Sequence, residues 1–268
     1  MIKDITIGQY IYGTSPLHKL EPWVKIVLTL VYAAVVLMLK APAAYAVYFA
    51  FTAAAVLIST VPVKMLLKGL KPLIWLFAFT SVFNLFLTPG EPLCSFRLGA
   101  LAVSISRAGI KASVLLALRL TLLVMGTSLL TLTTSPLQLT DGIEKLLKPL
   151  AGIKVPAHEI AMMTSIAIRF IPTIGEEADR LMKAQKARGA DMESGGIFKR
   201  ARAMTPILIP LLTSAFRRAD ELAVAMDARC YGGGKRTRMK VTHAGRRDAA
   251  AAAVLAAVSA AALIAGII

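Results

Sequence analysis

Two arginines end segments of similar sequence, and each could bind an acidic partner. Residues 176–189 read EEADRLMKAQKARG and residues 217–230 read RRADELAVAMDARC, with six identities at a constant offset of 41. Arg188 and Arg229 occupy the same position in the two copies. A guanidinium group presents a planar fork of N–H donors that fits a carboxylate. The repeat therefore predicts two similar binding tips, for two similar partners or for the two halves of a pseudo-symmetric dimer.

Each copy carries a helical stripe that ends in its arginine. In the first copy, positions at i, i+3, i+4 and i+7 spacing are Ala178, Leu181, Met182, Gln185 and Arg188. The arginines have small neighbours, Ala187 and Gly189 in one copy and Ala228 and Cys230 in the other, which allow another protein's backbone to approach. Two alternatives stay open. The likeness of the copies could be coincidental, or the arginines could be solvated helix ends that suit the helix dipole.

The second copy departs from the first at its last position, where cysteine stands in place of glycine. Gly189 is placed where glycine commonly ends a helix in a left-handed conformation. Cys230 is small enough for close approach, but a positive φ is less accessible to it than to glycine. We therefore expect the second helix to end further on, at Gly232, Gly233 or Gly234.

No other residues are spaced for catalysis or metal binding. His18, His158 and His243 are far apart in sequence and form no ligand motif, and Cys94 and Cys230 form no cluster. The chain also lacks a Walker lysine motif for nucleotide binding. The sequence therefore predicts a non-catalytic protein with no cofactor and no metal site.

The elements that must position the tips belong to a membrane protein. Of the 268 residues, 57% are hydrophobic and 17% are charged, and the mean hydropathy is +0.68. A helix needs about 17 to 25 apolar residues to cross a bilayer. Five segments qualify or nearly do, namely residues 23–39, 43–61, 73–87, 108–132 and 249–268. The predicted fold class is an all-α integral membrane protein with about five transmembrane helices and a cytoplasmic helical coupling region.

Basic residues orient these helices, because insertion retains lysine and arginine in the cytoplasm. The connection after the second segment carries Lys64, Lys68 and Lys71 and is expected inside. This puts the N-terminus inside, residues 88–107 outside and the C-terminus outside. Three regions follow: residues 1–132 with transmembrane helices one to four, residues 133–248 with cytoplasmic amphipathic and coupling helices, and residues 249–268 with the last transmembrane helix. Retention of basic residues in the cytoplasm also explains the net charge of +16 without a role in nucleic-acid binding. The sequence shows no aromatic-rich surface of the kind that binds nucleic-acid bases.

Arg119 lies inside the fourth apolar segment. A cation within the bilayer is costly, so this side chain is expected to face other helices or a wet crevice. It could line an ion or substrate path, or it could be a structural anchor bonded to helix carbonyls or partner groups. Because no Asp or Glu lies in any of the five apolar segments, we favour the structural anchor.

Seven short strings, spread over most of the chain, occur in a specific order and spacing. They are Gly8-Gln9-Tyr10, Ser15-Pro16-Leu17-His18-Lys19-Leu20-Glu21-Pro22 with Lys25, Leu118-Arg119-Leu120, Thr133-Thr134-Ser135-Pro136, Arg169-Phe170-Ile171-Pro172, Ala184-Gln185-Lys186-Ala187-Arg188-Gly189 and Ala225-Met226-Asp227-Ala228-Arg229-Cys230-Tyr231. Together they resemble the transmembrane T component of energy-coupling factor transporters, the family that includes the cobalt-transporter Q subunit.

The resemblance implies a scaffold and energy-coupling subunit of an importer for a vitamin or a transition-metal ion. Such a T component holds a substrate-binding S component in the membrane and two ABC-type ATPases beneath it, in a bacterial or archaeal cell membrane. The ATPase-binding residues it implies are Ala187, Arg188, Gly189, Ala228, Arg229 and Cys230. ATP would be hydrolysed by the partners only. The alternative class is a stand-alone secondary transporter or channel, which the lack of carboxylates in the apolar segments disfavours.

Overall fold

The computed structural model describes residues 10–71, 73–87, 92–98, 101–149, 156–190, 196–232 and 244–267. Its internal contacts divide the chain into two compact units. The first, here the membrane unit, comprises Ile7–Val155 and Thr242–Ile268 and contains the apolar helices. The second, here the hairpin unit, comprises Met1–Thr6 and Pro156–Val241 and contains two long amphipathic helices.

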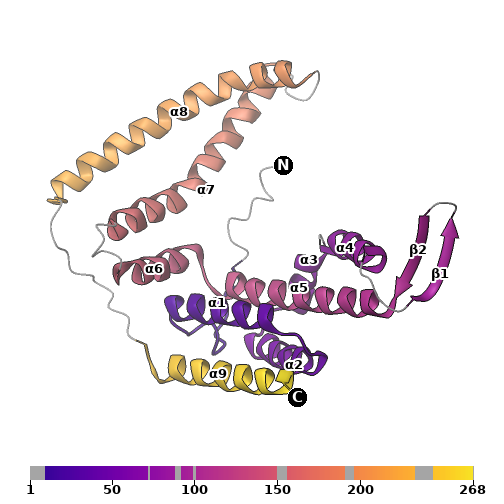
Figure 1. The fold of residues 1–268 in the computed structure, drawn as a ribbon. Helices are drawn as coiled ribbons and strands as arrows, with labels where there is room; N and C mark the ends of the chain where they lie inside the picture. The colour runs from indigo at the N-terminus through magenta and orange to yellow at the C-terminus, as the bar shows by residue number, and fades with distance from the viewer. Residues whose placement is uncertain are drawn as a thin grey trace. The chain divides into compact units, whose positions relative to one another are not determined.

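The helices of the membrane unit follow its apolar segments (Figure 1). They are α1 (Pro22–Met38), α2 (Pro42–Ser59), α3 (Val63–Leu70), α4 (Leu73–Leu87), α5 (Arg107–Thr133), α6 (Pro136–Leu147) and α9 (Arg246–Ile267). Proline opens α1, α2 and α6, because its missing N–H costs no hydrogen bond in the first helical turn. Ser135 caps α6 reciprocally: its hydroxyl oxygen accepts the Gln138 N–H at 3.3 Å, and Gln138 Oε1 accepts the Ser135 N–H at 3.1 Å.

Apolar helices of sufficient length confirm the predicted class of helical membrane protein. α2, α5 and the Arg246–Ala265 part of α9 are each long and apolar enough to cross a bilayer. α3 and α4 qualify only together, as a pair bent by 47°. α1 is apolar but has only 17 residues. With the bent pair and α1, the described residues offer five candidates, which agrees with the prediction of about five.

One small sheet interrupts the helical architecture. β1 (Pro92–Leu98) pairs antiparallel with β2 (Leu101–Ser106), with Phe96 opposite Val103 and an irregularity between Pro92 and Cys94. The two strands lie between α4 and α5 in the chain, within residues 88–107, for which the sequence predicted only an outside connection. The all-α prediction therefore holds for the bundle and misses this hairpin.

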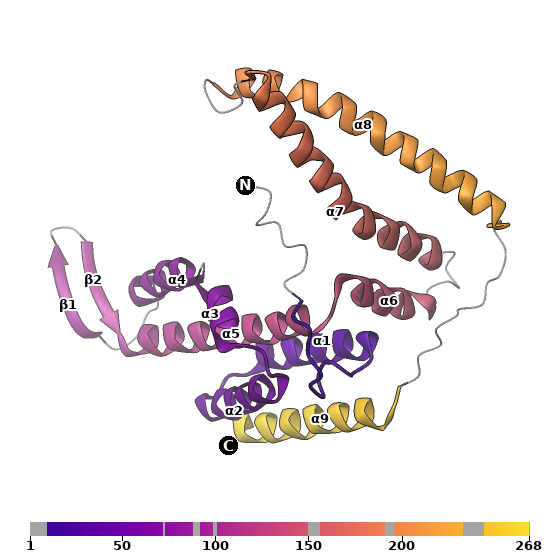
Figure 2. The same ribbon diagram turned by 180° about the vertical axis from the view of Figure 1, so that it is seen from behind.

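Four helices of the membrane unit enclose its main core. α1, α2, α5 and α9 meet around Val36, Tyr45, Tyr48 and Leu122, each at most 1% exposed. Figures 1 and 2 show α2 beside α9 and α1 beside α5. The Tyr48 hydroxyl and Ser259 Oγ form a hydrogen bond of 2.6 Å that joins α2 to α9. The last helix of the chain is thus an integral part of the bundle.

The hairpin unit consists of α7 (Ala157–Ala187) and α8 (Ile197–Ala228). The two helices are joined at one end and run in opposite directions, and α7 bends near its middle (Figures 1 and 2). Pro172 lies inside α7 in this region, and a proline there removes a helical hydrogen bond and kinks the helix. Because the helices run in opposite directions, their C-terminal ends lie at opposite ends of the pair.

Candidate partner-binding tips and polar junction

The C-terminal end of α7 has the backbone of a Schellman cap. Arg188 is the C-cap residue, and Gly189 follows with a φ of +84°. The Gly189 N–H donates to the Lys186 carbonyl at 3.0 Å and the Ala190 N–H donates to the Gln185 carbonyl at 3.0 Å. These two bonds satisfy carbonyls that have no partner within the helix. The helix therefore stops at Arg188, as the sequence pattern indicated.

The end of α8 has the same geometry, although no glycine is present. Arg229 is the C-cap residue, and Cys230 itself takes the left-handed conformation with a φ of 55°. The Cys230 N–H donates to the Asp227 carbonyl at 2.8 Å and the Tyr231 N–H donates to the Met226 carbonyl at 2.9 Å. The expectation that the helix would end at Gly232 or beyond is wrong. The two cap bonds outweigh the left-handed strain of a non-glycine residue, about 1–2 kcal/mol.

Both tips present their arginine to the surroundings. The residues concerned, all exposed, are Ala187, Arg188, Gly189, Ala228, Arg229 and Cys230. Within the described part of the chain, neither guanidinium group has a hydrogen-bond or ion-pair partner. A Cβ built on Gly189 would meet no atom within 4 Å, so the space around this tip is open. Each tip can therefore offer its full set of N–H donors to a carboxylate of another protein.

An ion pair links the two helices at equivalent positions of the repeat. Arg218 Nη2 of α8 bonds Glu177 Oε2 of α7, and both side chains are about three-quarters buried. These residues are separated by 41 positions, the offset of the repeat. Arg188 and Arg229 each follow their own ion-pair residue by eleven positions, about 16 Å along a helix. The two tips are therefore displaced by similar distances from one crossing point.

A second group of polar residues lies at one end of the membrane unit, where α1 begins and α5 ends. Lys25 of α1 is 6% exposed. Its ammonium group donates to the Thr133 carbonyl at 2.9 Å, to the His18 carbonyl at 3.2 Å and to Thr134 Oγ1 at 3.3 Å. Three acceptors satisfy the three N–H donors of a buried lysine. We call this group, with the residues described next, the polar junction.

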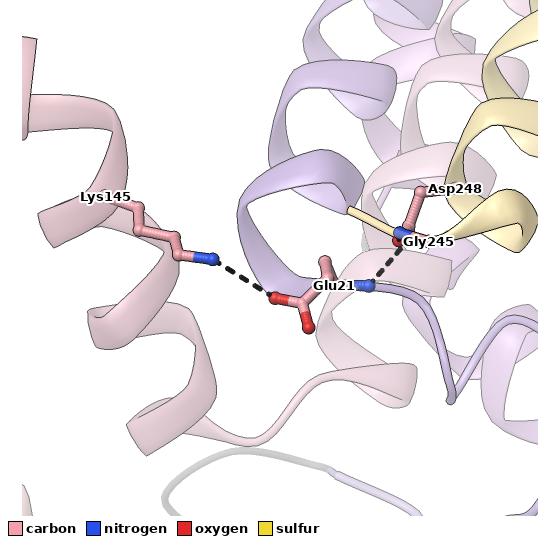
Figure 3. Close-up of polar contacts among 4 residues, drawn as sticks. All are labelled: Glu21, Lys145, Gly245 and Asp248. Atoms are coloured by element: carbon pink, nitrogen blue, oxygen red, sulfur yellow. Dashed lines mark hydrogen bonds and ion pairs between the residues drawn. The ribbon is translucent and has the colours of Figure 1, made fainter. Parts of the chain in front are cut away.

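The polar junction also contains the start of α9 and a lysine from the last turn of α6 (Figure 3). Asp248 of α9 is 6% exposed and accepts two backbone N–H groups, that of Glu21 at 2.9 Å and that of Gly245 at 2.8 Å. Lys145 of α6 lies 3.5 Å from Glu21 Oε2. One carboxylate thus caps the N-terminal ends of both α1 and α9, where negative charge is favourable. Residues from three distant parts of the chain are fixed together here.

The segment before α1 is held to the same end of the unit. The Ile11 N–H donates to the Leu132 carbonyl at 3.0 Å. His18 Nε2 lies 3.0 Å from the Ile11 carbonyl and Nδ1 lies 2.6 Å from Ser15 Oγ. Because a carbonyl only accepts, Nε2 carries a hydrogen, and in the neutral ring Nδ1 accepts from the Ser15 hydroxyl. His18 therefore has a structural role in folding this segment.

Arg119 bonds the end of α1 and the start of α2. Its Nη2 donates to the Leu39 carbonyl at 2.9 Å, and its Nε donates to the Tyr45 hydroxyl at 3.0 Å. That hydroxyl also donates to the Leu39 carbonyl at 2.9 Å. Leu39 is the C-cap residue of α1, whose carbonyl has no partner inside the helix. The guanidinium group joins three helices at this point.

The strings noted in the sequence gather at a few places. Residues 15–25 and 133–136, more than a hundred positions apart, meet in the polar junction, and residues 169–172 lie in the middle of α7. Gly8, Gln9 and His243 lie outside the described residues. No sequence pattern predicted a role for Asp248, Lys145 or the Glu21 carboxylate. The one available signal for Asp248 was an acidic residue in the first turn of a helix.

Several helices that are long and apolar enough to cross a bilayer define the class as a multi-pass membrane protein. Residues 13–241 match the family model described as cobalt transport protein, CbiQ. The chain belongs to this family, whose curated members include the energy-coupling factor transporter transmembrane proteins EcfT. It is a transport component rather than an enzyme.

Relatives with that name are similar over nearly the whole chain. The protein from Clostridium kluyveri is 52% identical over 249 residues, covering 92% of each chain. That from Ruminiclostridium cellulolyticum is 50% identical over 241 residues, covering 90% of this chain and 89% of the relative. That from Bacillus subtilis is 43% identical over 235 residues, covering 88% of each. Each is named energy-coupling factor transporter transmembrane protein EcfT.

Proposed function

We propose that this chain is the scaffold and energy-coupling subunit of an energy-coupling factor importer for a vitamin or a transition-metal ion. In this role Arg188 and its neighbours Ala187 and Gly189 bind one ABC-type ATPase. Arg229 and its neighbours, including Cys230, bind a second. The membrane unit holds a substrate-binding S component. The observation that carries the proposal is that both tips share one cap geometry and expose an arginine without a partner among the described residues.

The ion pair between the helices supports a coupled movement of the tips. Glu177 and Arg218 hold α7 and α8 together at equivalent positions of the repeat. Closure of two ATPases around ATP would exert a force on both tips. Because Glu177 and Arg218 join α7 and α8, the two helices would move together under this force. The movement would then tilt the S component and reorient its binding site. A partner binds each tip through carboxylates that match the guanidinium fork.

The proposed orientation keeps the N-terminus in the cytoplasm and the C-terminus outside. Within the membrane unit, Lys25 bonds Thr133 and the Glu21 N–H bonds Asp248, so the start of α1, the end of α5 and the start of α9 share one end. A cytoplasmic position for that end agrees with the lysines of α3, Lys64 and Lys68. A thiol-reactive, membrane-impermeant label at a cysteine introduced at either terminus would test it.

Charge reversal at the tips tests the docking. Arg188→Glu or Arg229→Glu should weaken retention of the ATPases in a pull-down from membranes, and the double variant should retain none. Removing one partner of a desolvated charge pair costs about 3–5 kcal/mol, and the opposite sign adds repulsion. Arg→Lys at either tip should also weaken binding, because an ammonium group is a point charge that cannot form the bidentate contact.

Matched controls lie on the same helices. Arg180 and Arg217 are also exposed, so Arg180→Glu and Arg217→Glu change the net charge equally but leave the tips intact. Both controls should retain the ATPases. A double tip variant that keeps both ATPases would refute the docking assignment. Transport by the purified chain alone would instead refute the role of an energy-coupling subunit and favour a stand-alone transporter.

A further inference from the structure

A cavity of about 530 Å³ lies within the membrane unit, between α1, α2, α5 and α9. Ligand sites commonly have volumes of about 300–1,000 Å³. The walls are mainly apolar, and four of the lining residues are alanines that leave this space unfilled, namely Ala54, Ala55, Ala250 and Ala251. The cavity is partly open to its surroundings. Three of the helices around it, α2, α5 and α9, are long and apolar enough to cross a bilayer, so lipid is the apolar molecule that its surroundings would supply.

Cationic groups line the cavity at one end, where α9 begins. Lys25 is there, but its ammonium group is buried and already bonded to Thr133 and Thr134. Arg247 also lines the cavity, and its side chain is exposed. Among the residues that the structure describes, Arg247 has no hydrogen-bond or ion-pair partner. The lining of a mainly apolar cavity thus includes an available guanidinium group, that of Arg247.

The shape of the cavity limits what can occupy it. Its lining on α9 runs from Arg247 to Leu255, which lie eight positions apart, or about 12 Å along the helix. A hydrocarbon chain suits the apolar walls, and an anionic group suits the guanidinium group of Arg247 at one end. An occupant that suits both ends therefore has a flexible apolar chain and an anionic head.

We propose that this cavity binds an anionic phospholipid. The phosphate lies on Arg247, and part of an acyl chain lies among Leu28, Val254 and Leu255, between α1 and α9. The acyl chain makes van der Waals contacts with the cavity walls that the short alanine side chains do not make. The guanidinium group donates hydrogen bonds to the phosphate oxygens. A neutral phospholipid offers the same chains but no net charge, so the site prefers the anionic lipid.

Native mass spectrometry of the purified chain in detergent tests this site with two lipids, phosphatidylglycerol and phosphatidylcholine of identical acyl chains. The wild-type protein should retain phosphatidylglycerol preferentially. Arg247→Gln should lower that preference about five-fold, the effect of one cation near an anionic lipid. Arg246 precedes it on α9 and does not line the cavity, so Arg246→Gln should leave the preference unchanged.

A second pair of variants tests the apolar part. Ala251→Phe fills the cavity and should reduce retention of both lipids, whereas Ala252→Phe, outside the lining, should not. If Ala251→Phe does not give a monodisperse protein, Ala250→Leu replaces it. Equal retention of the two lipids by the wild type would overturn the proposal. An equal loss of the preference for phosphatidylglycerol in Arg246→Gln and Arg247→Gln would also overturn it. Displacement of phosphatidylglycerol by inorganic phosphate alone would overturn it too, because the site would then bind free anions.

Discussion

Replacement of Asp248 with alanine should loosen the starts of two helices together. Its carboxylate accepts the Glu21 N–H at 2.9 Å and the Gly245 N–H at 2.8 Å. Asp248 is 6% exposed, so water replaces these bonds poorly. A hydrogen bond to a charged group contributes about 1.5–3 kcal/mol, and loss of a helix N-cap costs about 0.5–2 kcal/mol. With partial relaxation, the free energy of unfolding should fall by roughly 2–4 kcal/mol.

Thermal denaturation of the purified protein in detergent, followed by gel filtration, measures this loss. A change of this size should lower the midpoint by roughly 5–10 °C. Asp248→Asn keeps one acceptor oxygen and should fall between the wild type and Asp248→Ala. Asp141 is exposed on α6, so Asp141→Ala is a control that removes a carboxylate without uncapping a helix. A midpoint for Asp248→Ala equal to that of Asp141→Ala would refute the double cap.

Three further changes test other contacts. Cys230→Gly relieves a left-handed residue and should slow amide exchange at the end of α8 about five-fold, from roughly 1 kcal/mol of removed strain; faster exchange would contradict the cap. Gly142→Leu should lower the thermal midpoint by several degrees, because a Cβ there would lie 3.0 Å from the backbone of Pro22 and Trp23; Gly175→Leu, where a Cβ meets nothing within 4 Å, is its control. Glu177→Arg should weaken association of α7 with α8, measured by a disulfide cross-link between cysteines introduced in the two helices. Adding Arg218→Glu should restore the cross-link; no restoration would argue against the ion pair.

Much of the helical architecture was predictable because its signals are local. Runs of apolar residues predicted the spanning segments, and prolines at positions 22, 42 and 136 stand at the observed starts of three helices. The stop of α7 at Arg188 followed from the glycine after it. The stop of α8 did not, because cysteine has no strong preference for a left-handed backbone. Its conformation is imposed by the cap bonds from Cys230 and Tyr231.

Contacts between distant residues were out of reach of such signals. The bond from the Glu21 N–H to Asp248 joins residues 227 positions apart, and nothing near either one specifies the other. Lys25 belonged to one of the strings that carried the resemblance, yet its bonds to Thr133 and Thr134 depend on how α1 packs beside α5. The β1–β2 hairpin was missed because its strands of seven and six residues are too short to stand out from the longer apolar runs around them. The roles of the two tips remain predictions that binding experiments must test.

The pairing of Glu177 with Arg218 implies that the two copies of the repeat had to diverge. If the segments arose by duplication, equivalent positions once held the same residue. At a crossing where equivalent positions meet, as these do, identical copies would bring two carboxylates or two guanidinium groups together, and like charges repel. Substitution in one copy alone converts that repulsion into attraction. The repeat therefore combines unlike residues at the ion pair with identical arginines, Arg188 and Arg229, at the two tips.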